Sequence, residues 1–384
     1  MKAKLLQYAA MGLSLLALVN CAEAQTTNLS IAAAGKSSLL YWPASTTNSI
    51  VQMAGSPTST NWITVSNAFP VSAVIVTNSG PVGYYRLFSK ATNALPPAGM
   101  VLIPAGSFIL GNCVYFGTVT NEADILSASP TNTTVSAFYM DANLITLSQW
   151  QGVTVYAKSR GYSFENAGSG KAMNHPVQTV NWFDCIKFCN ARSEQDGLTP
   201  VYYVDATFVQ VFKTGVYPTA ALYVNWSANG YRLPTEAEWE KAARGGLTGN
   251  RFPWGNVIAQ TLANYDSGTG AYASVYDLGP SGYNAIGAMG GTSPATSPVG
   301  SFPPNGYGLY DMAGNVRQWC WDWYNSTPYA GGTDPHGPSG WWTYRIMRGG
   351  SWYDYGASLR CSVRPSDYPF SAYNYIGFRC VKNY

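Results

Sequence analysis

The stretch from Gly245 to Tyr384 constrains the fold most, because it is rich in glycine, proline and asparagine and carries scattered aromatic residues. Glycine and proline interrupt regular helices and strands. We therefore expect long loops, held in place by tryptophan and tyrosine side chains, with little regular secondary structure. Loops of this length are usually functional.

The overall composition narrows the class of protein. Only 11% of the residues are charged, which is about half the usual share for a soluble domain. The net charge of +3 comes from 22 basic and 19 acidic residues without a basic block, so we do not expect a nucleic-acid partner. Two histidines, His175 and His336, are too few for a histidine-rich zinc or iron centre.

The N-terminus has the pattern of an export signal. Two lysines precede an apolar run from Leu5 to Val19, and Ala22-Glu23-Ala24 is a small-x-small cleavage site. We predict a signal peptide over residues 1–24 and a secreted or periplasmic protein. The apolar run is too short for a membrane span. A lipoprotein attached through Cys21 is the alternative, which the bulky Asn20 disfavours.

Two further domains follow. Residues 25–92 read as short strands between Ser/Thr/Asn/Pro turns, which predicts a small β-sandwich-like domain. Residues 93–98 are a proline-containing linker, and residues 99–384 form the second domain. The strand candidates of the first domain are Ser38–Trp42, Trp62–Val65, Ala73–Val76 and Gly83–Phe88.

Three helices are expected in the second domain. One begins near Leu147, and one covers about residues 181–193, with apolar residues at helical spacing. A short third helix follows Thr235, because Thr235 and Glu238 have the spacing of a capping box. The second domain is therefore of the α+β class.

Six cysteines remain after removal of the leader, and an even number permits disulfides in an oxidising compartment. Their spacing does not reveal the pairing. They are Cys113, Cys185, Cys189, Cys320, Cys361 and Cys380.

A series of motifs in one order resembles the formylglycine-generating enzyme, or sulfatase-modifying factor, family over residues 99–384. The resemblance implies a compact C-type-lectin-like fold with little regular secondary structure. The motifs are Gly230–Glu240, Ala243–Gly246, Phe252–Asn256, Ser297–Gly300, Pro304–Asp311, Gly314-Asn315, Trp319, Asp322-Trp323 and the closing segment Arg348–Arg379.

The resemblance does not extend to the reactive thiols. In the oxidising members two cysteines follow the Arg-Gly-Gly-Ser sequence and bind copper as thiolates, a ligand that suits Cu(I). Here Asp354 stands at the first position, and residues 355–359 contain no thiol. We therefore expect no copper and no catalytic residue. The iron-dependent branch would need three histidines, which this chain lacks.

The closing segment instead holds aromatic and small polar residues, which suit a recognition surface because tyrosine offers large contact area at low entropy cost. This filling is similar to that of retroelement-diversified lectin-fold proteins. We predict an exported, non-catalytic protein that binds a protein or peptide, a sulfatase being one candidate. The alternatives are an oxidase that converts a sulfatase cysteine to formylglycine, or a paralogue with altered chemistry. The predicted ligand-binding residues are Arg317, Tyr353, Asp354, Tyr355, Asp367, Tyr368, Tyr373, Asn374 and Tyr375.

The resemblance also implies calcium and one disulfide. A first calcium site would use Asp311, Gly314, Val316 and Gln318, since hard oxygen donors on an irregular loop suit Ca²⁺. A second would use Asn264 and the Tyr265 carbonyl, with Asp266 or Asp277 as the acid. Turn capping is the alternative role of these residues. Cys189 and Cys380 match the positions of a family disulfide.

Two groups of motif residues have a plain structural interpretation. Glu236, Glu238 and Glu240 resemble acid–base carboxylates, but we expect them to cap the helix and to bridge to Arg232 or Arg244. Burial is the commoner fate of tryptophan. We expect it for Trp182, Trp239, Trp254, Trp319 and Trp323.

Overall fold

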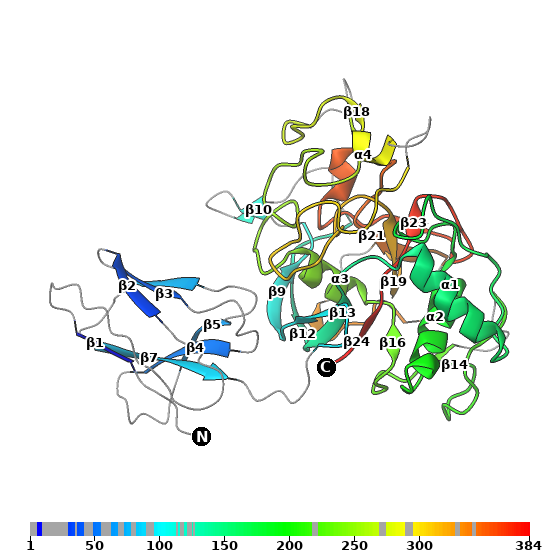
Figure 1. The fold of residues 1–384 in the computed structure, drawn as a ribbon, viewed down its shortest axis with the longest axis horizontal. Helices are drawn as coiled ribbons and strands as arrows, with labels where there is room; N and C mark the ends of the chain where they lie inside the picture. Colours follow the sequence, from blue (N-terminus) through cyan, green and yellow to red (C-terminus); the bar gives the residue numbers. More distant parts are fainter. Residues whose placement is uncertain are drawn as a thin grey trace. The chain divides into compact units, whose positions relative to one another are not determined.

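The computed structural model describes the strands between residues 6 and 89 and most of residues 96–384. Within the latter range it leaves out 113, 116–118, 121–124, 126, 217–221, 269–273, 289–294, 327–330 and 340–342. The chain forms two compact units, Met1–Leu95 and Pro96–Tyr384 (Figure 1). This division lies inside the predicted linker.

The described part of the first unit is made of antiparallel strands in two sheets, ordered β1-β7-β4-β5 and β2-β3-β6. The four strand candidates correspond to β3, β5, β6 and β7. β1 falls within the predicted signal peptide, which stays a prediction, as does export. The strands are β1 Leu6–Ala9, β2 Ser30–Ala34, β3 Ser37–Tyr41, β4 Ser49–Ala54, β5 Ile63–Asn67, β6 Ala73–Thr77 and β7 Val82–Ser89.

Each of the three expected helices of the second unit is present and begins with a complete capping box. α1 (Leu147–Lys158) is capped by Thr146, α2 (Trp182–Gln195) by Asn181, and α3 (Glu236–Ala243) by Thr235. Each cap satisfies backbone N–H groups that the first turn leaves open, which contributes about 1 kcal/mol. α4 (Ala285–Ala288) and a 3₁₀ helix over Gly356–Leu359 were not expected.

Two four-stranded sheets organise the second unit. The first has the order β16-β24-β13-β8 and joins Tyr231–Arg232, Val381–Asn383, Phe138–Asp141 and Met100–Ile103. The second has the order β22-β21-β19-β23 and joins Ser366–Asp367, Arg345–Arg348, Arg317–Trp323 and Ile376–Gly377. Regular structure beyond Gly245 is sparse, as expected, and its longest strands are β19 and β21, which pair antiparallel across an irregularity between Trp319 and Trp323.

Shorter pairings complete the second unit (Figure 1). β20, β12 and β9 form a three-stranded sheet, and three further sheets have two strands each. Their bounds are β9 Gly106–Leu110, β10 Val114–Tyr115, β11 Val119–Thr120, β12 Thr131–Val135, β14 Tyr202–Tyr203, β15 Tyr223–Val224, β17 Asp266–Ser267, β18 Gly282–Tyr283 and β20 Gly332–Thr333.

Aromatic side chains fill the core between the helices and the second sheet. The Trp150 ring stacks on Phe188 at 5.3 Å between centroids, and Phe378 meets both rings edge-on. Trp182, Trp239 and Trp319 are completely buried, as expected. Trp254 and Trp323 are half-buried.

The second unit is thus an α+β domain with few helices and short strands, in agreement with the expected fold class. In the part of the chain that the structure describes, none of the helices has the length and apolar character needed to cross a membrane.

Candidate functional site

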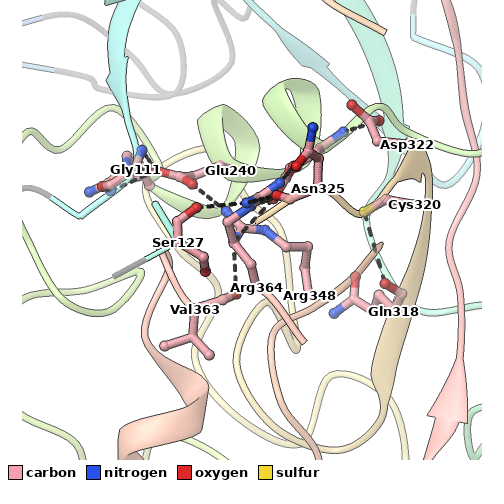
Figure 2. Close-up of polar contacts among 12 residues, drawn as sticks. Gly111, Ser127, Glu240, Gln318, Cys320, Asp322, Asn325, Arg348, Val363 and Arg364 are labelled. Atoms are coloured by element: carbon pink, nitrogen blue, oxygen red, sulfur yellow. Dashed lines mark hydrogen bonds and ion pairs between the residues drawn. The ribbon is translucent and has the colours of Figure 1, made fainter. Parts of the chain in front are cut away.

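Three arginines of the closing segment have buried side chains and are held by acceptors from distant segments. We call Arg348, Arg364 and Arg379 the arginine frame. Arg364 forms two hydrogen bonds with the Glu236 carboxylate, at 2.6 and 2.8 Å. Arg348 donates to the Val363 carbonyl at 2.7 Å and pairs with Glu240. Figure 2 shows Arg348 and Arg364 converging on the acidic side chains of α3.

Each glutamate of α3 forms an ion pair with an arginine. Glu238 forms two 2.6 Å hydrogen bonds with Arg232, and Glu240 accepts from Arg244 at 2.7 and 3.0 Å. The pKa of Glu236 is lowered overall. Burial alone would raise it, but the attraction of Arg364 and Arg348 for the carboxylate outweighs that effect. The predicted roles are confirmed for Glu238, which completes the cap and pairs with Arg232, and for Glu240, which pairs with Arg244. For Glu236 the predicted partners are wrong, because it pairs with Arg364 and Arg348 instead.

Arg379 closes the frame on the other side of the segment. Its Nε donates to Gln318 Oε1 at 2.8 Å, and its terminal nitrogens donate to the carbonyls of Asp141 and Tyr310 at 3.0 and 2.6 Å. The ends of the closing segment are therefore fixed to the sheets.

Asp354 lies between these fixed points and is buried rather than displayed. Its Oδ2 accepts from Ser351 Oγ at 2.6 Å and from Arg317 Nε at 2.8 Å, while Oδ1 accepts from the other end of the same guanidinium. Both carboxylate oxygens are therefore occupied. The side chain at the thiol position and the arginine of β19 form one internal ion pair.

Three tyrosines stack beside this pair, of which Tyr353 and Tyr373 are exposed and Tyr375 is half-buried. The Tyr353 and Tyr375 rings are 5.7 Å apart and Tyr375 and Tyr373 are 5.2 Å apart, each pair tilted by 13°. Arg317 lies over the Tyr375 ring at 5.1 Å. The buried ion pair therefore supports the middle ring of the stack.

A second group of rings belongs to the same segment. Tyr368 stacks on Phe370 at 5.2 Å and packs against Tyr344 at 4.7 Å. Asp367 accepts from the Tyr368 backbone N–H and from Ser371 Oγ, so its carboxylate fixes the turn. We call the following side chains the tyrosine face: Tyr353, Tyr368, Phe370, Tyr373, Asn374 and Tyr375.

The tyrosine face continues onto rings outside the closing segment. Tyr283 of β18 packs against Trp352 at 6.1 Å. Partial burial raises the pKa of the Tyr283 phenol, and the neighbouring Asp266, Tyr353 and Tyr355 raise it further. Tyr355 is half-buried and its backbone bridges to Asp266.

The contacts of Gln318 do not fit the first predicted calcium site. Gln318 Oε1 accepts from Trp239 Nε1 and Arg379 Nε, both at 2.8 Å, and its Nε2 donates to the Asp311 carbonyl at 2.9 Å. The amide thus turns a donor, not an oxygen, toward Asp311. The Asp311 carboxylate accepts from the Gly300 backbone and the Asn315 amide. Of the predicted ligands, Gly314 and Val316 could contribute only backbone carbonyls.

At the second predicted calcium site, several of the predicted ligand residues already form hydrogen bonds within the protein. Asn264 donates its amide to the Ala295 carbonyl at 3.0 Å, and the Tyr265 carbonyl accepts from the Asn284 N–H at 3.2 Å. Tyr265 also donates its hydroxyl to Asp277 Oδ1 at 2.5 Å. Among the described residues, no three or more acidic, histidine or cysteine side chains are grouped so that they could hold a metal ion. Calcium at this site remains a prediction.

The described cysteines are buried thiols. Burial raises the pKa of Cys185, Cys189 and Cys320 well above the ordinary value of a thiol. Cys189 Sγ and Cys380 Sγ are 3.7 Å apart, and both thiols are free in this structure, so their disulfide stays a prediction. Cys113 lies outside the described residues.

Sequence reasoning missed several contributors to the face. Phe370 is 57% exposed, although its apolar character favours burial in a sequence-based view. Tyr283 and Tyr344 join the face from other loops, and no sequence signal indicated their proximity. The short Tyr368-Pro369-Phe370 sequence was a usable signal, because proline between two aromatics favours an exposed turn.

Comparison with known proteins agrees with this architecture. The model of the sulfatase-modifying factor enzyme 1-like domain matches residues 84–384. The formylglycine-generating enzyme of Bos taurus is 32% identical over 309 residues, which cover 75% of this chain and 76% of that protein. A chaperone protein, LppX, of Paenibacillus barcinonensis is 32% identical over 267 residues, covering 69% of this chain and 82% of LppX.

Two solved structures resemble the chain at 28% identity. Treponema denticola variable protein 1 superposes with a TM-score of 0.56 over 74% of this chain and 95% of its own. CarF gives a TM-score of 0.53 over 75% of this chain and 99% of its own. With the family model covering most of the chain, the protein belongs to the sulfatase-modifying factor enzyme 1-like domain family.

Proposed function

We propose that this protein is an exported, non-catalytic family member that binds a protein or peptide through the tyrosine face. One observation carries the proposal. Asp354, at the position of the first copper-binding thiol, has both carboxylate oxygens engaged by Arg317 and Ser351, while exposed rings stack around it. In this proposal, the side chain at position 354 supports the tyrosine face through Arg317.

The composition of the tyrosine face favours binding. Tyr353, Tyr368, Phe370 and Tyr373 are each at least 40% exposed. Rigid aromatic side chains lose little entropy on contact and are over-represented where affinity is concentrated. The buried arginine frame reduces the cost of ordering the segment on binding.

Two relatives support a binding role. LppX is named a chaperone protein, and the Treponema protein is named variable. We include in the proposal that the tyrosine face is the segment that varies between close copies of this protein. Genomic DNA tests this: a nearby near-copy of the coding segment for residues 353–375, differing at adenines, is expected. A locus without such a copy removes this part of the proposal and leaves binding itself intact.

Catalysis is the alternative, and a single assay separates the two. The purified protein is loaded with copper, incubated with a Cys-x-Pro-x-Arg peptide, and the peptide is then probed for an aldehyde. We expect no product, because a buried carboxylate cannot replace a pair of thiolates as a Cu(I) ligand. Turnover that a chelator abolishes would overturn the non-catalytic assignment.

A sulfatase is the first partner to test for the binding role, because formylglycine-generating enzymes are among the relatives. A pull-down with exported sulfatases should retain one on the native protein. The Tyr353→Ala/Tyr373→Ala variant should retain less, since it removes both ends of the ring stack. Equal retention by both proteins would place the binding surface elsewhere.

A further inference from the structure

Asp266 is a buried carboxylate without a counter-charge beside the tyrosine face. It begins β17 and is only 9% exposed. Its backbone N–H donates to the Asp354 carbonyl at 3.0 Å, and it pairs with Tyr283 across the β17–β18 ladder. Among the described residues its carboxylate makes neither a hydrogen bond nor an ion pair. A buried charge of this kind is costly unless something compensates it.

A second acid adds to this excess of negative charge. Asp277 Oδ1 accepts from the Tyr265 hydroxyl and from the Gly279 N–H at 3.0 Å, but Oδ2 is buried without a hydrogen-bond partner in the described structure. Arg251 and Arg360 lie over the Tyr276 ring. Neither forms an ion pair with Asp266 or Asp277 among the described residues.

Aromatic rings continue from the cross-strand partner of Asp266 toward the tyrosine face. Tyr283 is 40% exposed and packs on Trp352, and Trp352 meets Tyr353 edge-on at 5.6 Å. Tyr353 and Tyr355 lie close enough to Tyr283 for their charges to act on its phenol. Ring faces beside a carboxylate attract a cation through the quadrupole of the rings and through Coulomb interaction.

The molecule already uses this arrangement internally. The Arg317 guanidinium is paired with Asp354 and lies over the Tyr375 ring at 5.1 Å. Asp266 and Tyr283 offer the same combination of carboxylate and ring, but the described structure supplies no cation there. We propose that this place is filled by an arginine or lysine side chain of the protein or peptide that the tyrosine face binds. This inference rests on the proposed function and names the chemistry of its partner.

A basic side chain fits this place better than a calcium ion does. Ca²⁺ takes six to eight oxygen ligands, whereas the residue directly across the ladder from Asp266 is the aromatic Tyr283. A planar guanidinium stacks on rings and pairs with a carboxylate at the same time, which a hard metal ion cannot do. The ring beside the carboxylate therefore favours an organic cation.

Selection from a random peptide library displayed on phage tests the inference with the full-length protein. Enriched peptides should carry arginine or lysine more often than the unselected library. Binding of a selected peptide should weaken about tenfold in Asp266→Asn, which keeps the shape and removes the charge, because a desolvated cation–π and ion-pair contact is worth about 1–2 kcal/mol. Asp205→Asn, on an exposed loop, is the matched control and should leave affinity unchanged.

The possible results separate this inference from the proposed function. Enriched peptides without basic residues, or equal affinity of Asp266→Asn and the native protein, overturn the inference while binding stands. Failure to enrich any peptide above the level of the Tyr353→Ala/Tyr373→Ala variant overturns both. Calcium that displaces the peptide from the native protein and is not bound by Asp266→Asn would assign the place to a metal ion and overturn the inference.

Discussion

The arginine frame and the tyrosine face share one short segment and differ in every physical respect. Arg348 and Arg379 are completely buried and each is held by several acceptors. Tyr353 and Tyr373 are about half exposed, and each stacks on Tyr375 between them. The stabilising contacts and the proposed recognition surface therefore occupy alternating parts of the same segment, so we expect the exposed residues to tolerate change without loss of the fold.

The largest effect should come from the acid that two arginines share. Glu240→Ala leaves Arg348 and Arg244 without their common carboxylate and removes the acceptor of the Gly111 N–H. We expect a loss of about 3–5 kcal/mol in unfolding free energy, since uncompensated buried charges remain. Chemical denaturation followed by tryptophan fluorescence measures it. A loss in unfolding free energy as small as that of a surface substitution would show that the arginine frame does not stabilise the fold more than the tyrosine face does.

The Arg317–Asp354 pair should have an intermediate effect, because it joins the frame to the face. Asp354→Ala leaves a half-buried guanidinium unpaired, and we expect a loss of about 2–3 kcal/mol. Arg317→Leu combined with Asp354→Leu should recover part of it, because an unpaired charge costs more than its absence. A double-mutant cycle gives the coupling. Additive single and double variants would show that the pair stabilises nothing.

Lys241 on α3 sharpens the comparison, because this buried cation is held by carbonyls instead of a carboxylate. Its Nζ donates to the Gly106 carbonyl at 2.7 Å, and burial lowers the pKa of Lys241 to about 8, with Asp334 opposing. The pKa of Lys241 in the folded protein is below the ordinary value, so burying its charge lowers the unfolding free energy by the full amount at any pH below about 8. That cost is relieved as the pH rises further.

The native protein should therefore gain stability relative to Lys241→Met between about pH 8 and about pH 10. We expect about 1–2 kcal/mol after allowance for screening by water. Thermal unfolding across this pH range measures it, with the exposed Lys158→Met as the matched control. A difference that stays constant with pH would mean that the Lys241 charge is well compensated.

The smallest effect on stability should come from the face itself. Tyr373 is 46% exposed, so Tyr373→Ala should change the unfolding free energy by no more than about 0.5 kcal/mol. Phe378→Ala, a buried ring of the same segment, should cost about 3–5 kcal/mol. Comparable losses in the two variants would show that the face is part of the core.

Local signals made the helices and their acids predictable. The spacing of Thr235 and Glu238 gave the start of α3, and Asn181 gave that of α2. The arginine partners of Glu238 and Glu240 followed because helix caps and short sequence separations limit where these side chains reach. β19 and β21 were not predicted, because their glycine- and proline-rich flanks obscured the pairing of two distant segments.

The site was predictable in residue type but not in geometry. The aromatic filling of the closing segment indicated a surface, and Tyr353 and Tyr373 lie on it. Asp354 was expected there too, but it faces inward, because its partner Arg317 approaches from a strand far away in the sequence. The orientation of Gln318 depends in the same way on Trp239 and Arg379, which no local pattern relates to it.

The place of β24 in its sheet has a kinetic consequence. β24 lies between β16 and β13, where Met140 faces Val381 across a very large sequence separation. Closing so long a loop slows folding, and β13 keeps one unpaired edge until residues 381–383 arrive. We expect the second unit to stay open to proteases and chaperones throughout its synthesis and then to close late, in a single cooperative step.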